Sequence, residues 1–294
     1  MAGNVNHDYH ILEPDIWPLI GAFSALAFTS GLVLNLNPTI LGETTSSVVI
    51  WAGLAGLLAT FFFWFKNVVI EAQRGDHTPV VQLHMRYGMI LFIASEVMFF
   101  VGWFWSFFDF ALFPAPLAVT DAGTAEQITE NLFFAGDNAL GNLVPDGMEV
   151  LDPFSLPLLN TMILLCSGTT VTWAHHALIH GDREGLKQGL WATIALGVLF
   201  SAIQAYEYSV APFNFGDNTY GSAFYMATGF HGFHVLVGTI FLAVCLFRAY
   251  KGHFTPRQHF GFEAAAWYWH FVDVVWLFLF IAVYVWGGAG AEYH

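Results

Sequence analysis

The sequence has few charged residues and only two cysteines, and its first residues include no basic one. Only 10% of its 294 residues are charged, where a soluble domain has about 25%. The first fifteen residues contain no Lys, no Arg and no apolar run, so we expect neither a secretory signal nor an Arg-rich transit peptide. The two cysteines, Cys166 and Cys245, have no metal-ligand spacing and lie at different expected depths, so we expect neither a disulfide nor a zinc site.

Long apolar runs make up most of the chain, and hydrophobic residues account for 56% of it. A helix needs about 20 apolar residues to cross the hydrocarbon core of a bilayer. Such runs, punctuated by Gly and Pro, predict helices at about 16–35, 47–70, 86–113, 155–180, 187–209, 221–247 and 263–287. The sequence therefore predicts an all-α, polytopic integral membrane protein, a seven-transmembrane-helix bundle forming a single membrane domain over residues 1–294.

The basic residues are confined to alternate loops, and these loops set the expected orientation. All of them lie in or next to the second, fourth and sixth loops: Lys66, Arg74, Arg86, Arg183, Lys187, Arg248, Lys251 and Arg257. Because Lys and Arg are retained on the cytoplasmic side, we expect a cytoplasmic N-terminus and a periplasmic C-terminus. The loop at about 113–154 is acidic and without a base, which fits either a solvated loop or a docking surface.

Ionisable groups lie deep in the predicted spans. A charged side chain there costs about 2.5 to 3.5 kcal/mol, so it calls for a partner or a function. Glu96 is expected near the midplane, as are His231 and His234, which share one helical face. We therefore predict a hydrogen bond from Glu96 to one of the two imidazoles, as a structural clamp or as part of a proton relay.

Other polar groups have plainer interpretations. Asp273, one turn after His270, is expected to make a buried contact between helices. His175 and His176 lie near the inner end of their helix and point about 100° apart, so they are poor candidates for one metal ion. Basic and aromatic residues at the inner headgroup level are candidates for phospholipid phosphates, or they serve only to set the topology: Lys66, His77, Arg86, Arg248 and Lys251.

Three titratable groups precede the first span: His7, Asp8 and His10. Imidazoles titrate near neutral pH, so these residues form a possible proton antenna at the cytoplasmic surface. An ordinary polar terminus is the alternative.

Several blocks of sequence carry a family resemblance. The stretch Gly261 to Trp276, GFEAAAWYWHFVDVVW, closely resembles the last-helix signature of cytochrome c oxidase subunit III. Supporting blocks cover most of the chain: His77-Thr-Pro79, Tyr87 to Ile93, Ser95-Glu96-Val97, Trp173-Ala-His-His176, Gln204-Ala-Tyr-Glu207 and Ala227 to His234. Seven spans also favour this branch over the related quinol oxidase subunit, which typically has five.

The resemblance implies a non-catalytic core subunit of an aa3-type oxidase of the respiratory chain. It implies no redox centre and no metal in this chain, haem a and copper in the catalytic subunit I, and a dicopper centre in subunit II. It also implies a lipid-filled cleft between helices 1-2 and 3-7, with structural phospholipids. The implied role is to stabilise subunit I and to sustain proton uptake, with membership of a respiratory supercomplex left open.

The same resemblance implies roles for single residues. Glu96 matches a carbodiimide-reactive carboxylate, and His77 and Arg248 match lipid-headgroup contacts. Trp64 belongs to the run Trp64-Phe-Lys-Asn67, which differs from the Trp-Trp-Arg-Asp typical of mitochondrial members. The third loop lacks their usual Trp-Pro-Pro stretch. We therefore interpret the chain as bacterial, located in the inner (plasma) membrane.

Rival classes fit the sequence less well. A seven-helix photoreceptor pump needs a Lys in the last span, and residues 263–287 contain none. A secondary transporter commonly shows internal repeats, and none is visible. A haem-carrying subunit would use a histidine such as His231 or His234, which absorbance of the isolated subunit would reveal.

Overall fold

The structure is a computed structural model that describes residues 8–9, 14–37, 43–112, 144, 148–216, 219–289 and 291–294. Within these residues, seven helices are long and apolar enough to cross a membrane. The protein is therefore a seven-helix membrane bundle. Its chain divides into two compact units, Met1–Met85 and Arg86–His294, which are described separately.

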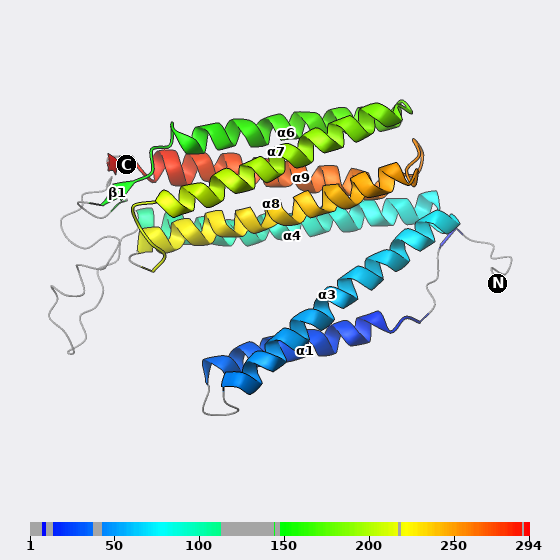
Figure 1. The fold of residues 1–294 in the computed structure, drawn as a ribbon, viewed down its shortest axis with the longest axis horizontal. Coiled ribbons are helices and arrows are strands. Elements are labelled where there is room, and N and C mark those ends of the chain that lie inside the picture. The colour runs from blue at the N-terminus through cyan, green and yellow to red at the C-terminus, as the bar shows by residue number, and fades with distance from the viewer. Residues whose placement is uncertain are drawn as a thin grey trace. The chain divides into compact units, whose positions relative to one another are not determined.

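The first unit is built on two helices, α1 (Trp17–Leu36) and α3 (Glu43–Arg74), which lie side by side (Figure 1). Small residues let their backbones approach closely, as is common between membrane helices. A Cβ added at Gly53 would meet the backbone of Phe28, and one added at Gly31 would meet that of Ile50. Glycine is thus required at both positions for this packing.

Helix α4 (Pro79–Leu112) begins in the first unit and continues into the second. It begins seven residues before the expected position 86, because Pro79 fits the first turn of a helix, where its missing N–H is not needed. The apolar pattern locates the segment inside the membrane, whereas the helix itself extends beyond that segment.

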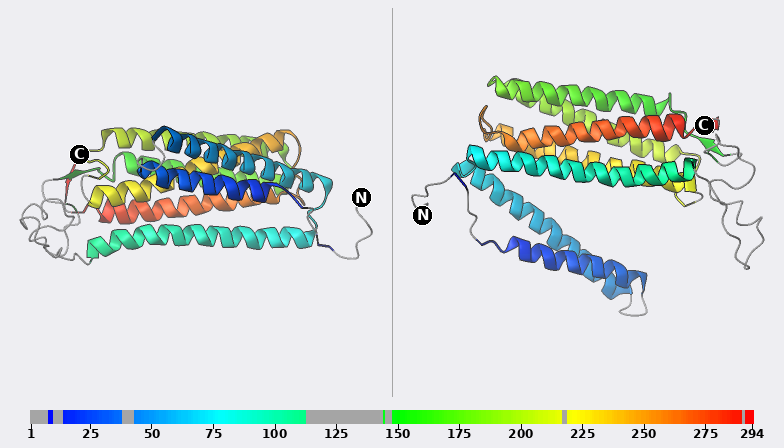
Figure 2. Two further views of the ribbon diagram at one scale, coloured as in Figure 1. Left: turned by 90° about the horizontal axis from the view of Figure 1, so that it is seen from below. Right: turned by 180° about the vertical axis from the view of Figure 1, so that it is seen from behind.

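The second unit also contains α6 (Leu156–Ile179), α7 (Arg183–Val210), α8 (Thr219–Tyr250) and α9 (Phe260–Leu279). These four helices lie alongside one another (Figures 1 and 2). Between α6 and α7 the chain turns at Gly181, whose φ of 78° suits glycine. Asp182 then caps α7, accepting hydrogen bonds from the backbone N–H groups of Glu184 and Gly185.

Helix α9 lies at the centre of the second unit and is attached to α6 by its tryptophans. The Trp269 indole donates to the Ser167 hydroxyl at 2.8 Å, and the Trp276 indole donates to that of Thr161 at 2.9 Å. All four side chains are buried. The hydroxyls satisfy the indole N–H groups, which would otherwise be costly in an apolar core.

The last helix changes its winding near its end. Residues Phe280–Trp286 form a π-helical segment, η1. Beyond it, the chain end pairs with residues that precede α6: β1 (Glu149–Val150) and β2 (Glu292–Tyr293) form a parallel two-stranded sheet. Glu149 pairs with Glu292 and Val150 with Tyr293.

Candidate functional site

Glu96 and His234 form a polar pair within the second unit. Glu96 comes from α4 and His234 from α8, and the Glu96 Oε2 atom lies 2.8 Å from His234 Nε2. The side chain of Glu96 is 24% exposed and that of His234 is 9% exposed. Aromatic rings surround the imidazole, including Phe100 at 5.0 Å and Tyr268 at 6.3 Å between ring centroids. The predicted partner of Glu96 is thus His234 rather than His231.

A second contact of His234 fixes where its hydrogen lies. The Nδ1 atom is 2.7 Å from the backbone carbonyl oxygen of Phe230. A carbonyl only accepts hydrogen bonds, so Nδ1 is the donor. The short contact between Nε2 and Glu96 then needs one proton, carried either by the carboxyl or by the imidazole. The pair as a whole is neutral in both cases, which suits an apolar site.

His231, one turn before His234 on the same helix, is held in the opposite tautomer. Its Nε2 donates to the carbonyl oxygen of Val272 at 3.1 Å, while its buried Nδ1 has no hydrogen-bond partner in the described part of the chain. A second proton on Nδ1 would therefore lack an acceptor. His231 is fixed as a neutral packing residue, with its ring 4.9 Å from that of Trp276, and it does not contact Glu96.

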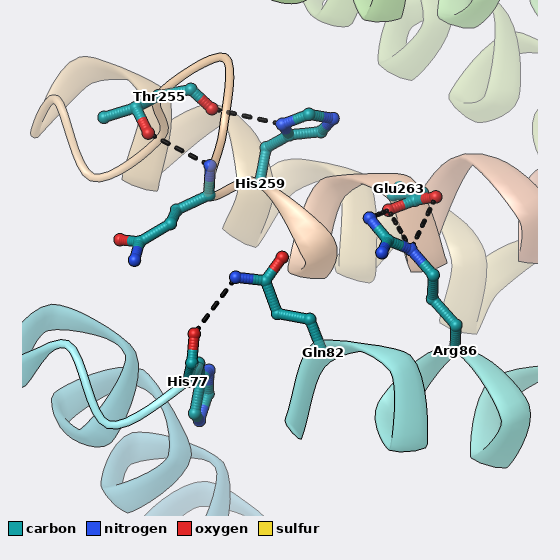
Figure 3. A network of polar contacts seen from close by, with 7 residues as sticks. His77, Gln82, Arg86, Thr255, His259 and Glu263 are labelled. Carbon is teal, nitrogen blue, oxygen red and sulfur yellow. Dashed lines mark hydrogen bonds and ion pairs between the residues drawn. The ribbon is translucent and has the colours of Figure 1, made fainter. Parts of the chain in front are cut away.

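An ion pair fixes the beginning of α4 against α9. Figure 3 shows the guanidinium of Arg86 facing Glu263, with its Nε 3.1 Å from both carboxylate oxygens and its Nη2 2.9 Å from Oε2. The turn that leads into α9 is closed nearby by His259, whose Nδ1 donates to the carbonyl oxygen of Thr255. Two parallel contacts orient a guanidinium more firmly than one.

The other candidate phospholipid contacts differ in their surroundings. Trp64 is 45% exposed, and the ammonium of Lys66 lies 6.0 Å from the ring of Phe63. His77 Nε2 is 3.9 Å from Glu71 Oε2, and its backbone carbonyl accepts a hydrogen bond from Gln82 (Figure 3). Trp64, Lys66 and His77 all belong to the first unit.

Arg248 lies over the ring of Phe254 at 4.5 Å, and its buried Nε has no partner among the described residues. Beyond the end of α8, burial together with the charges of Arg248 and Lys251 lowers the pKa of His253. Arg86 is already paired with Glu263, whereas no carboxylate of the described residues pairs with Arg248. Whether any of these side chains binds lipid stays a prediction.

The proposed antenna is described only in part. His7 and His10 lie outside the described residues, as does most of the acidic segment 113–154. The backbone carbonyl of Asp8 accepts a hydrogen bond from the Thr78 hydroxyl at 2.5 Å, and the ring of Tyr9 stacks on His84. Residues 8–9 are therefore attached near the beginning of α4, within the first unit.

Asp273 makes the expected buried contact between helices. It lies against α6, where a Cβ added at Gly168 would overlap its Oδ2 atom. His270 Nε2 contacts the hydroxyl of Thr172 at 3.1 Å. His175 faces His259, with ring centroids 5.4 Å apart. Among the described residues, no group of three or more His, Cys, Asp or Glu side chains is placed to hold a metal ion.

Two acidic residues escaped the sequence reasoning. Glu263 lies at the beginning of the last predicted span, where an acid needs no special explanation, although Arg86 at the corresponding end of the third span is a signal for pairing. Glu207 stands out in the sequence only as part of the block Gln204 to Glu207. It lies three residues before the end of α7, yet it is completely buried.

The fold and these contacts define a polytopic helical membrane protein whose buried ionisable groups are paired between helices. The family model for cytochrome c oxidase subunit III matches residues 7–121 and 133–288. The chain is 49% identical to cytochrome c oxidase subunit 3 of Aepyceros melampus and of Dugong dugon, and 48% identical to that of Tragelaphus imberbis. Each match covers 96% of this chain and 98% of the relative.

The chain belongs to the cytochrome c oxidase subunit III family. It is therefore a subunit of a respiratory oxidase complex and has partner subunits in that complex. The three relatives named are mammalian, so the bacterial interpretation stays a prediction.

Proposed function

We propose that this chain is a non-catalytic core subunit of an aa3-type cytochrome c oxidase, in which it stabilises the catalytic subunit and sustains proton uptake. Subunit I would hold haem a and copper, and subunit II the dicopper centre. The observation that carries the proposal is the family match over both units of the chain. The partners would occupy the bilayer beside it, where many large apolar side chains of the spanning helices are exposed.

The Glu96 and His234 pair supports the link to proton uptake. It holds one proton between a carboxyl and an imidazole, and the carboxyl remains partly exposed. A protonated carboxyl in apolar surroundings is also the form that reacts with a carbodiimide. The pair thus joins α4 to α8 and can pass its proton between two atoms.

Structural phospholipid is the second part of the proposal. The first unit has an apolar groove of about 350 Å³ between α1 and α3, a volume that could hold part of an acyl chain. The groove is lined by Ile16, Leu19, Ile20, Phe23, Ser24, Ala27, Ala52 and Gly53. Trp64, Lys66 and His77 are further candidates for headgroup contacts in this unit, as Arg86 and Arg248 are in the other. The lipid-filled cleft expected from the family belongs to the same proposal.

The test is steady-state oxygen consumption with reduced cytochrome c, followed over many turnovers in complexes with and without this subunit. We expect the depleted complex to start with normal activity, lose it within the experiment, and slow further as pH rises. Identical behaviour from the first turnover to the last would overturn the proposed role.

The antenna forms a separate part of the proposal, with the N-terminus on the cytoplasmic side of a bacterial inner membrane. His7, Asp8 and His10 would collect protons for the uptake channel of the neighbouring subunit. Replacing both histidines by Gln should slow proton uptake at pH 8, whereas replacing the distant His294 by Gln should not. An unchanged rate in the double variant would exclude the antenna.

A further inference from the structure

A second buried carboxyl, Glu207, lies in a hydrogen-bonded network that joins three elements of the second unit. The Glu207 Oε1 atom accepts a hydrogen bond from the Tyr284 hydroxyl at 2.6 Å and another from Gln204 Nε2 at 3.1 Å. Gln204 also donates to the Tyr284 oxygen at 3.4 Å. Asn160 of α6 donates to Gln204 Oε1 at 3.4 Å and to the carbonyl oxygen of Phe200 at 3.3 Å.

The donors of the neutral members are directed away from the second carboxylate oxygen. The Tyr284 hydroxyl donates to Glu207 Oε1, and Gln204 Nε2 shares a hydrogen between Oε1 and the Tyr284 oxygen, which lie only 2.6 Å apart. The Asn160 amide donates to Phe200 and Gln204, and turning it around would not help, because its oxygen would then face two other acceptors. Among the described residues, no donor therefore reaches Glu207 Oε2.

Two acceptors in this network have no partner among the residues that the structure describes. They are Glu207 Oε2 and Asn160 Oδ1, and both atoms are buried. An ionised carboxylate with one bare oxygen is among the costliest groups to bury. A proton on the carboxyl removes the charge, which is the largest part of this cost, and leaves only a neutral hydroxyl at Oε2.

We infer that Glu207 binds a proton at Oε2 and is a neutral carboxylic acid in the folded subunit. The protonated acid keeps both hydrogen bonds at Oε1. It joins α7 to α6 through Gln204 and to η1 through Tyr284, without a charge in the core. The ligand of this site is a single proton, and the site is distinct from the Glu96 and His234 pair.

The π-helical segment supports a specific role for Tyr284. A π-helical turn contains more residues than an α-helical turn, so it changes the direction in which the following side chains point. Such segments are frequent at functional sites. Within η1, Tyr284 is completely enclosed, with its ring 5.1 Å from that of Phe224. Among the described residues, the titratable groups facing Glu207 are Tyr284 and, on its own helix, Tyr208. Neither supplies a positive charge that could balance a carboxylate.

Isotope-edited infrared spectroscopy of the purified oxidase complex tests the inference. With ¹³C-labelled glutamate, the difference between the wild type and Glu207→Gln should show the loss of a protonated carboxyl C=O band. Glu184→Gln is the matched control, because Glu184 lies on the same helix and is exposed. Its difference spectrum should show the loss of carboxylate bands instead. Carboxylate bands lost from Glu207→Gln would overturn the inference and would indicate a bound water as the missing donor.

A second variant keeps the test decisive if Glu207→Gln does not assemble. Tyr284→Phe leaves the carboxyl in place and removes one hydrogen bond to its C=O oxygen. We expect the protonated C=O band to shift to higher frequency and to stay present. A wild-type spectrum with no such band, or a band that does not respond to Tyr284→Phe, would assign the proton elsewhere and overturn the inference.

Discussion

His231 and His234 are neighbouring imidazoles on α8 that differ in their hydrogen-bond partners. They lie three residues apart on one helical face, and both are largely enclosed. Their hydrogens nevertheless lie on opposite nitrogens, because one imidazole donates to Val272 and the other to Phe230. The sequence predicts that one of the two imidazoles contacts Glu96 but not which one. His231 uses its Nε2 to bond Val272, whereas His234 bonds Phe230 through Nδ1 and so keeps its Nε2 for Glu96.

Substitution of Glu96 tests the shared proton. Glu96→Gln supplies an amide hydrogen to His234 Nε2, so we expect an assembled complex of nearly wild-type thermal stability that no longer reacts with carbodiimide. Glu96→Leu leaves the imidazole nitrogen unpaired and should lower the free energy of unfolding by about 1–3 kcal/mol. Thermal unfolding in detergent and labelling measure the two effects. Undiminished labelling of Glu96→Gln would mean that another carboxyl is reactive.

Gly168 is a position at which a single methyl group matters. A Cβ there would overlap the Asp273 carboxylate, so we expect Gly168→Ala to destabilise the subunit by about 1–3 kcal/mol. The matched control is Gly102→Ala on α4, where no atom lies within 4 Å. That variant should be neutral or slightly stabilising, since Ala favours helix more than Gly by about 1 kcal/mol. Equal melting temperatures for both variants would contradict this account of the contact.

At the scale of elements, α4 is fixed to the rest of the second unit by side chains spaced along its length. The Arg86 and Glu263 ion pair lies near its beginning, and the Glu96 contact with His234 lies near its middle. Towards its end, Phe107 packs against Trp286 with ring centroids 6.2 Å apart. Polar and aromatic contacts between helices thus replace the close backbone approach seen between α1 and α3.

The ion pair of α4 can be isolated by a double-mutant cycle of Arg86→Ala and Glu263→Ala. Its bidentate geometry and partial burial predict a coupling free energy of about 1 kcal/mol, at the upper end for such pairs. The pair of Lys187 and Glu184, three residues apart on α7 and with an exposed carboxylate, should give about 0.3 kcal/mol. Equal coupling in both cycles would show that the second contact of the guanidinium adds nothing.

Element boundaries show where sequence reasoning stops. Hydropathy located all seven spans, because the membrane imposes both their length and their composition. It missed the beginning of α4 at Pro79 and the π-helical winding of η1. Both depend on local backbone hydrogen bonds, to which average apolarity is insensitive. The burial of Glu207 could not be predicted from hydropathy either. A residue near the end of a helix is buried only if the neighbouring helices also extend to that level, and the sequence of one helix does not show this.

For the molecule as a whole, the distribution of basic residues predicts a single orientation in the membrane. We expect Gln258→Cys, in the turn before α9, to react with an impermeant thiol reagent only from the cytoplasmic side. Phe215→Cys, between α7 and α8, should react only from the other side. Both positions are exposed, and Cys166→Ser provides the background because Cys245 is buried. Labelling of both from the same side would contradict the seven-span topology.

The exposed apolar side chains of the helices also affect how the protein behaves once it leaves the membrane. Leu36, Leu91 and Trp105 are each more than 70% exposed, and many similar side chains lie along the spans. In solution a belt of surfactant must cover them, because apolar surface of this extent does not stay dispersed in water. Light scattering and sedimentation therefore report the combined mass of the surfactant belt and the polypeptide. The stoichiometry of the purified oxidase follows only after the surfactant mass has been subtracted.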